Sequence, residues 1–394
     1  MNSQNQHAGW RAWLAVTALG IGSFAIVTAE LAPIGLLSQI SADVMRPTSQ
    51  VGLIVTLYAW IAAGAAIASA VWLGGLPRRP ILITLMCVLA ISSCLSALAE
   101  NYAWLMSARI VGAFAHGAFW AMIGTLGAQL VPARQVGLAT SIIFGGVSVA
   151  SVLGVPLSNY IGYYSGWRTA FMIIGILSVF VAIAVRITLP KVAGSGRIGS
   201  KSLLNVLANR RLQRIFWATL FTVTAHFMAF TYVEPFLSES ASMPKEMIAP
   251  LLLVFGAAGI AANVLTGALI DNQLKAILTT SLAIAFGSLL LLAIWGNALG
   301  LFGVIIALIL WGGAIAAILV GLQTWVLIEA GEEALQASAV YVALFNGAIG
   351  LGAAIGGGLL GSTGLTGLFI AAAIFVCFGL AAILVLREPA LAQS

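Results

Sequence analysis

The chain has 394 residues, of which 61% are hydrophobic and only 7% are charged, whereas about a quarter of the residues in a soluble domain are charged. So few charges cannot cover a water-exposed surface, which excludes a soluble enzyme. The formal net charge of +6 comes from basic residues spread over the connections between apolar segments, without the basic stripe typical of nucleic-acid binding. Composition therefore predicts an integral membrane protein.

Twelve apolar stretches follow one another along the chain, each near the length of about 20 residues that crosses a bilayer as a helix. We expect helices at 13–37, 50–73, 80–99, 103–130, 136–160, 169–189, 213–237, 246–270, 276–295, 299–328, 335–361 and 365–386. The first run is longer than a signal-peptide core and contains Glu30 and Pro33, so it is interpreted as a retained helix. The least distinct separations are at Glu100-Asn101 and Gly296-Asn297.

Basic residues indicate the orientation of these helices. If the N-terminus is cytoplasmic, most of the 17 lysines and arginines fall on the cytoplasmic side, and only Arg46, Arg168 and Lys245 fall outside. The positive-inside bias therefore predicts that both termini are cytoplasmic, which requires an even number of crossings.

The longest polar interruption divides the chain nearly in half. It predicts an N-terminal six-helix bundle at 1–189, a cytoplasmic linker at 190–212 and a C-terminal six-helix bundle at 213–394. The first helix of each half carries a glutamate close to a proline, Glu30 with Pro33 and Glu234 with Pro235. Two copies in the same orientation are what a parallel repeat of bundles predicts.

Several short motifs carry a resemblance to a known family. They are TAELAPIGLL (28–37), LYAW (57–60), RIVGAFAHGAFW (109–120), LGVPL (153–157), GWR (166–168), TAH (224–226) and YVEPF (232–236). In these motifs, and over essentially its whole length, the chain resembles the major facilitator superfamily, in particular its drug:proton antiporter branch and the bacterial sugar efflux transporters that export arabinose. The resemblance implies an all-α membrane fold of two six-helix bundles in a bacterial inner membrane.

Gating residues are implied by the same resemblance. Gly154 and Pro156 match the antiporter motif, which is associated with export. The loop after the second helix keeps the basic part of the family's loop motif in Arg78 and Arg79 but lacks its aspartate. A latch that depends on this carboxylate is expected instead in the second half, at Asp271 with Lys275.

Five ionisable side chains fall inside predicted helices: Glu30, Arg109, His116, His226 and Glu234. A charge at the bilayer centre costs about 2.5 to 3.5 kcal/mol on insertion scales, so each is expected to face a partner or a water-filled cavity. A rise of about 1.5 Å per residue places Glu30 and Arg109 at nearly the same depth. We therefore hypothesise an ion pair between them that protonation of Glu30 weakens; a permanent packing bridge is the alternative.

Arg109, His116 and Trp120 share one face of the fourth helix, because they are seven and four residues apart. Hydrogen-bonding groups beside an aromatic ring suit a sugar, which has hydroxyl edges and apolar CH faces. Alternatively, His116 is a hydrogen-bonded bundle residue and Trp120 packs or faces lipid.

The second half offers further candidates. His226 lies near the middle of the seventh helix, where an imidazole relays protons or binds sugar, and Glu234 lies near its outer end as a proton carrier or an exposed helix-end residue. Tyr58, Asn346 and Gln323 are polar groups in apolar helices that line the same expected cavity or bond to a neighbouring helix.

No metal-ligand cluster, phosphate loop or Ser/His/Asp arrangement is evident, and the three cysteines lie in apolar runs. We therefore expect no cofactor and no enzymatic activity, with an ion gradient as the energy source. The predicted function is proton-coupled export of small sugars by a monomer whose partners are substrate, protons and membrane lipid, with no nucleic acid. Export of amphipathic drugs by the same scaffold is the alternative, and a channel or a non-transporting receptor is the alternative from another class.

Overall fold

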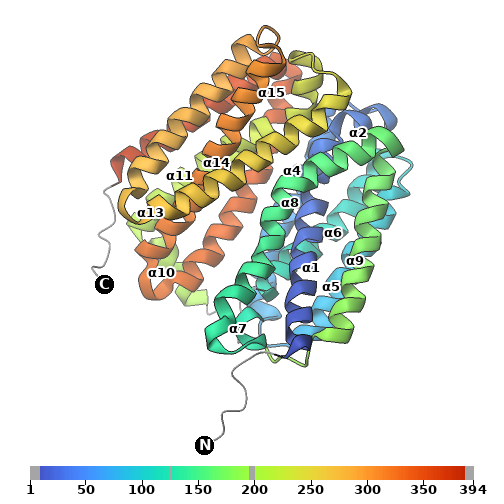
Figure 1. The fold of residues 1–394 in the computed structure, drawn as a ribbon, viewed down its shortest axis with the longest axis vertical. Coiled ribbons are helices and arrows are strands. Elements are labelled where there is room, and N and C mark those ends of the chain that lie inside the picture. The colour runs from blue at the N-terminus through green and yellow to red at the C-terminus, as the bar shows by residue number, and fades with distance from the viewer. Residues whose placement is uncertain (1–8, 124–125, 195–199, 387–394) are drawn as a thin grey trace, which may run out of the picture. The chain divides into compact units, whose positions relative to one another are not determined.

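The computed structural model describes residues 9–123, 126–194 and 200–386, and in these ranges the regular structure is helical, without a β-strand (Figure 1). The α-helices are α1 (Trp10–Gly35), α2 (Leu37–Asp43), α3 (Thr48–Val51), α4 (Leu53–Trp72), α5 (Arg78–Ala97), α6 (Tyr102–Ile123), α7 (Leu126–Leu130), α8 (Val136–Ser165), α9 (Trp167–Thr188), α10 (Ser200–Ala208), α11 (Arg210–Phe230), α12 (Val233–Pro235), α13 (Lys245–Trp295), α14 (Gly300–Ala330) and α15 (Ala334–Val385). Short 3-10 turns occur at Ala133–Gln135 and Gly331–Glu333, and a π-helical turn at Phe236–Ser240.

Within the described residues, nine helices are long and apolar enough to cross a membrane, or ten if α11 and the bent segment after it form one span. The nine do not include α6, in which Arg109 and His116 reduce the hydropathy. They count α15 once, although Gly364 interrupts it with φ +68°, a conformation that suits glycine. Counting α11 with its bent segment as one span, adding α6 and dividing α15 at Gly364 gives the twelve predicted spans, and the expected all-α membrane fold is confirmed.

The helices form two compact units: Met1–Ala32 with Ile61–Ile198, and Pro33–Trp60 with Gly199–Ser394. Helices α1 and α4 each run from one unit into the other. In the first unit α5 packs against α6 and α9; in the second, α13 packs against α14, and α11 against α15 (Figure 1). The predicted bundle boundaries and linker stay a prediction.

Small residues let backbones approach closely in the first unit. A Cβ at Gly146 of α8 would overlap the carbonyl oxygen of Gly20 in α1, and a Cβ at Gly117 of α6 would overlap that of Ala62 in α4. Because lipid is as apolar as the side chains, such close van der Waals contacts are a main source of helix association in membranes. Glycine is therefore required where these helices cross.

Two adjacent glycines provide a test of this packing. Gly146→Ala is expected to destabilise the protein by about 1 to 3 kcal/mol, the usual cost of overpacking. Gly145→Ala is the matched control, because a Cβ there meets nothing within 4 Å. Thermal unfolding in detergent should show a lower melting temperature for Gly146→Ala alone; equal melting temperatures would contradict the close crossing.

Candidate functional site

Glu30 and His116 are buried and form a polar cluster with the half-buried Trp120 in the first unit. The Glu30 Oε2 atom on α1 lies 3.6 Å from His116 Nε2 on α6. The indole Nε1 of Trp120 donates a hydrogen bond of 2.9 Å to the same His116 Nε2 atom, and the Trp120 ring stacks on Phe144 of α8 at a centroid distance of 6.0 Å. Glu30 is 6% exposed and His116 is 1% exposed, so bulk water does not reach the pair freely.

The donor identities assign the protons in this cluster. An indole nitrogen only donates, so His116 Nε2 accepts with its lone pair, and the imidazole is neutral with its proton on Nδ1. The Glu30 carboxylate therefore faces a nitrogen that has no proton to offer. One additional proton placed between Oε2 and Nε2 would join the two groups, but it would need the lone pair that Trp120 now occupies.

Arg109 reaches α1 next to Glu30. Its Nη2 atom donates a hydrogen bond of 2.6 Å to the carbonyl oxygen of Ala29, and its guanidinium lies over the Phe171 ring of α9 at 5.3 Å. Pro33 lies four residues after Ala29 and has no N–H, so this carbonyl lacks its usual partner within the helix. Arg109 satisfies it. The hypothesised Glu30–Arg109 ion pair stays a prediction, while the bond to Ala29 was missed, although Pro33 signals the freed carbonyl in the sequence.

His226 lies in the second unit among aromatic rings. Its imidazole stacks on Phe230 at 5.0 Å between centroids and meets Phe227 of the same helix at 4.9 Å. Phe255 of α13 and Trp311 of α14 lie at 6.2 and 5.6 Å. The predicted proton carrier is thus enclosed mainly by aromatic rings.

Glu234 occupies the bend after α11. Pro235 cannot continue the helical hydrogen-bond ladder, and the two helical segments differ in direction by 47°. The Glu234 Oε2 atom accepts a hydrogen bond of 3.0 Å from the backbone N–H of Ser38 in α2. Glu234 is 5% exposed, so the alternative of an exposed helix-end residue does not hold.

The three weaker substrate-binding candidates in the second unit, Tyr58, Asn346 and Gln323, differ in burial. Tyr58 and Asn346 are buried, and Asn346 Nδ2 donates to the Val342 carbonyl of its own helix at 2.9 Å. Gln323 is exposed. Their predicted contact with substrate stays a prediction.

Three of the predicted gating residues, Arg78, Arg79 and Lys275, make polar contacts near the ends of helices. Arg78 is buried, with Nη1 2.7 Å from Met122 Sδ, and Arg79 Nη2 donates to the Arg186 carbonyl oxygen. Lys275 Nζ donates to the carbonyl oxygens of Leu384, at 3.0 Å, and Leu386 near the end of α15.

Two further gating positions lie in α8, where Gly154 and Pro156 are buried. A Cβ at Gly154 would lie 3.2 Å from Thr28 Oγ1 on α1, two residues before Glu30. The side chain of Asp271 lies outside the described residues, so its predicted latch with Lys275 stays a prediction.

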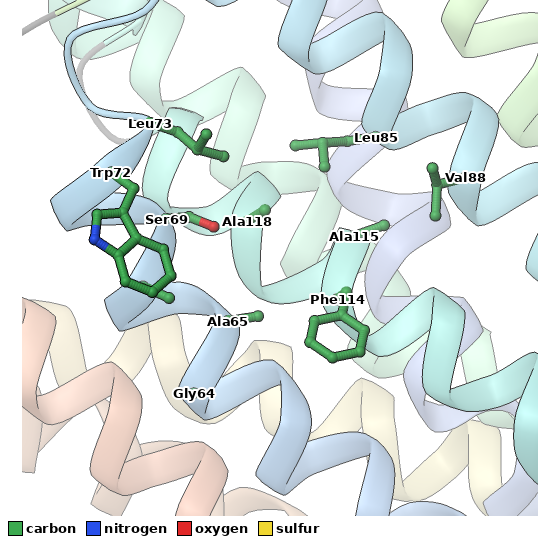
Figure 2. Close-up of a pocket in the computed structure, with 11 residues that line it drawn as sticks. Gly64, Ala65, Ser69, Trp72, Leu73, Leu85, Val88, Phe114, Ala115 and Ala118 are labelled. Atoms are coloured by element: carbon green, nitrogen blue, oxygen red, sulfur yellow. The ribbon is translucent and has the colours of Figure 1, made fainter.

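An open apolar pocket of about 390 Å³ lies among α4, α5 and α6 in the first unit. Figure 2 shows Trp72 and Phe114 beside it and Ser69 as the side-chain hydroxyl among its lining residues. It contains none of the predicted site residues. A sugar needs several hydrogen-bond partners, so this pocket does not fit one.

Comparison with solved structures finds the same fold in membrane transporters. The structure of a bacterial homologue of the human lysosomal transporter Spinster, inward-facing and unoccupied, matches with a TM-score of 0.76 and 15% identity, over 95% of this chain and 97% of that one. Its occupied form matches with a TM-score of 0.75 and 16% identity, over 95% and 96%. The human organic anion transporter MFSD10 (TETRAN) matches with a TM-score of 0.69 and 15% identity, over 95% and 99%. At these identities the likeness concerns the fold alone.

The sequence itself matches the family model of the Major Facilitator Superfamily over residues 13–335. This match covers most of the predicted helices, including those that carry Glu30, Arg109, His116 and His226. The chain therefore belongs to the Major Facilitator Superfamily, a family of membrane transporters.

Proposed function

We propose that this transporter exports small sugars such as arabinose across a bacterial inner membrane in exchange for protons. The observation that carries the proposal is the contact of Glu30 with His116 at 3.6 Å, inside an apolar bundle and next to the donor Trp120. A carboxylate and an imidazole in contact are a natural site for one exchangeable proton. Ionisable groups in this environment are costly, which favours a functional role for them.

The arrangement couples proton binding to the position of an aromatic side chain. When a proton enters between Glu30 Oε2 and His116 Nε2, it takes the lone pair and releases the indole N–H of Trp120. When the proton leaves toward the cytoplasm, the lone pair is restored and Trp120 bonds His116 again. The lone pair of His116 Nε2 binds one partner at a time, so the proton and the Trp120 contact exclude each other. A ligand that contacts Trp120 in only one of the two states, proton-bound or proton-free, therefore shifts the equilibrium between them.

The sugar assignment rests on the neighbourhood of this cluster and on the sequence motifs. The side chains of His116 and Arg109 are of the hydrogen-bonding kind and lie on the same helix as the Trp120 ring, the combination that suits hydroxyl groups and apolar CH faces. In this scheme Glu30 carries the proton, Arg109 holds the helix at Ala29, and Trp120 transmits the change to the substrate.

Export of amphipathic aromatic compounds is the second candidate. It is favoured by the rings around His226 (Phe227, Phe230, Phe255 and Trp311), which offer stacking surfaces but few hydrogen-bonding groups. The two candidates differ in chemistry, so substrate competition distinguishes them.

Transport by purified protein in liposomes tests the proposal. With an acidic lumen and inside-out protein, labelled arabinose should accumulate against its gradient, and a proton ionophore should abolish the accumulation. Accumulation of a cationic dye that excess arabinose does not inhibit would favour the second candidate. Downhill movement without response to the pH gradient would indicate a channel, and no movement of either compound would contradict both transport proposals.

The proton-coupling step has its own test in Trp120→Phe. Loss of the indole N–H removes a stabilising hydrogen bond from the proton-free state, so protons bind more readily. We expect the pH for half-maximal proton-driven transport to rise by roughly half to one unit, from a net hydrogen-bond energy of about 0.5 to 1.5 kcal/mol. Trp217→Phe, at a residue stacked on Phe221 in the second unit, is the control. An unchanged pH profile in Trp120→Phe would contradict the competition for the lone pair.

A further inference from the structure

A second cavity combines three basic side chains with an otherwise apolar lining. It has a volume of about 600 Å³ and lies in the first unit, where α5 begins and α9 ends. Its lining residues are Pro77, Arg79, Pro80, Ile83, Arg186, Lys191, Val192 and Ala193. Three of these eight described residues are cationic and none is acidic. The proposed export mechanism uses no part of this cavity.

The walls of the cavity are held by backbone contacts. The N–H of Arg78 donates a hydrogen bond of 2.9 Å to the carbonyl oxygen of Val192, which ties the segment after α9 to the start of α5. A Cβ at Gly194 would lie 2.5 Å from the Gly74 carbonyl oxygen, so the same segment also packs on the turn before α5. Arg79 bonds the Arg186 carbonyl oxygen across the two helices. The cavity is therefore a built feature of the unit.

The positive charge of the cavity follows from the sequence of the loop before α5. The loop Gly74-Gly75-Leu76-Pro77-Arg78-Arg79 keeps its basic residues and lacks a carboxylate. Three cations around one cavity repel each other unless an anion lies between them. A phosphate suits such a site, because arginine donates paired hydrogen bonds to phosphate oxygens and lysine adds a mobile point charge.

An exposed apolar face of α9 leads away from the cavity. Ile176, Phe180, Ile183 and Ile187 follow the helical spacing of four, three and four residues, and all are exposed, Ile187 by 73%. Such a face is where acyl chains lie. Free phosphate would use the cations alone, whereas a phospholipid would use the cations and this face together.

We propose that the cavity binds the phosphate headgroup of an anionic phospholipid, with its acyl chains along the Ile176–Ile187 face of α9. The positive-inside pattern places the cavity on the cytoplasmic side, where anionic headgroups attract basic clusters. A zwitterionic lipid brings its own cation into the cluster and binds more weakly.

Native mass spectrometry of the full-length protein, with phosphatidylglycerol or phosphatidylcholine added to the detergent, tests the assignment. We expect retention of phosphatidylglycerol in preference to phosphatidylcholine. The double variant Arg186→Gln/Lys191→Gln keeps the Arg79 bond to the backbone of residue 186 and should weaken phosphatidylglycerol binding at least tenfold, since each lost basic residue is worth about fivefold. Arg79→Gln in addition should weaken it further.

Arg134→Gln/Arg210→Gln is the matched control, because it removes the same charge at exposed positions outside the cavity. Its binding should equal that of the wild type. If the control pair weakened phosphatidylglycerol binding equally, net charge alone would explain the loss, and the proposed site would be wrong. Binding of inorganic phosphate as tight as that of phosphatidylglycerol would overturn the lipid assignment in favour of a free anion, because the apolar face of α9 would then add nothing. Equal retention of both lipids would overturn the role of the three cations.

Discussion

Replacement of Glu30 by glutamine is expected to abolish proton-driven accumulation while leaving substrate exchange intact. Glutamine keeps the size of the side chain and its hydrogen bonding but does not titrate. A charge at this depth costs about 2.5 to 3.5 kcal/mol, which corresponds to roughly a hundredfold change in an equilibrium between two states. In the proposed mechanism Glu30 and His116 share one proton. Without titration at Glu30, His116 would lose this partner and the Trp120 contact would no longer respond to pH.

Two assays on the same liposomes separate coupling from binding. Accumulation driven by an imposed pH gradient should fall to the protein-free background in Glu30→Gln, whereas exchange of labelled for unlabelled substrate at equal pH should continue. Glu329→Gln is the control, since the Glu329–Arg211 pair lies near the surface, where ion pairs contribute little. Full proton-driven accumulation by Glu30→Gln would remove Glu30 from the mechanism, and loss of exchange as well would assign it to substrate binding.

Gly357→Leu is expected to reduce transport at least tenfold without preventing folding. In the second unit a Cβ at Gly357 of α15 would lie 2.8 Å from the Ser49 carbonyl oxygen and 2.7 Å from the Tyr232 hydroxyl. The Tyr232 hydroxyl also donates to the Ala353 carbonyl oxygen at 2.9 Å. A leucine side chain would force α3 away from α15. If transport alternates between states with and without the α3–α15 contact, the substitution favours the state without it. A free-energy difference of about 1.4 kcal/mol changes the populations of the two states tenfold.

The neighbouring glycine is the matched control. A Cβ at Gly358 meets nothing within 4 Å, so Gly358→Leu should transport like the wild type. A cysteine at Ser49 reports on the contact, and its labelling by a membrane-impermeant maleimide should be faster in Gly357→Leu than in Gly358→Leu. Equal labelling with normal transport would show that the contact does not take part in the transport cycle; loss of the folded protein in detergent would show that it is structural.

Hydropathy alone predicted the membrane-spanning helices well. The predicted breaks between 246–270 and 276–295 and between 335–361 and 365–386 coincide with non-helical backbone at Gln273 and Gly364. Spans are readable from sequence because lipid requires each crossing to satisfy its own backbone hydrogen bonds within about 20 apolar residues. The helical spacing of His116 and Trp120 likewise predicted their shared face, and their hydrogen bond confirms it.

The partners of these side chains were decided by tertiary structure. Depth along the helix axis predicted that Glu30 and Arg109 lie at a similar level, and that ion pair stays a prediction. Depth is one coordinate, and the rotation of α1 and α6 about their axes decides which other side chains meet. The packing of Gly117 on α4 and of Gly20 on Gly146 sets these rotations, and it brings Glu30 to His116 and Arg109 to the Ala29 carbonyl. The sequence by itself thus determined that polar groups lie within the membrane, because burying them is costly. Which of them lie in contact depended on how closely the helices pack, which no single helix specifies.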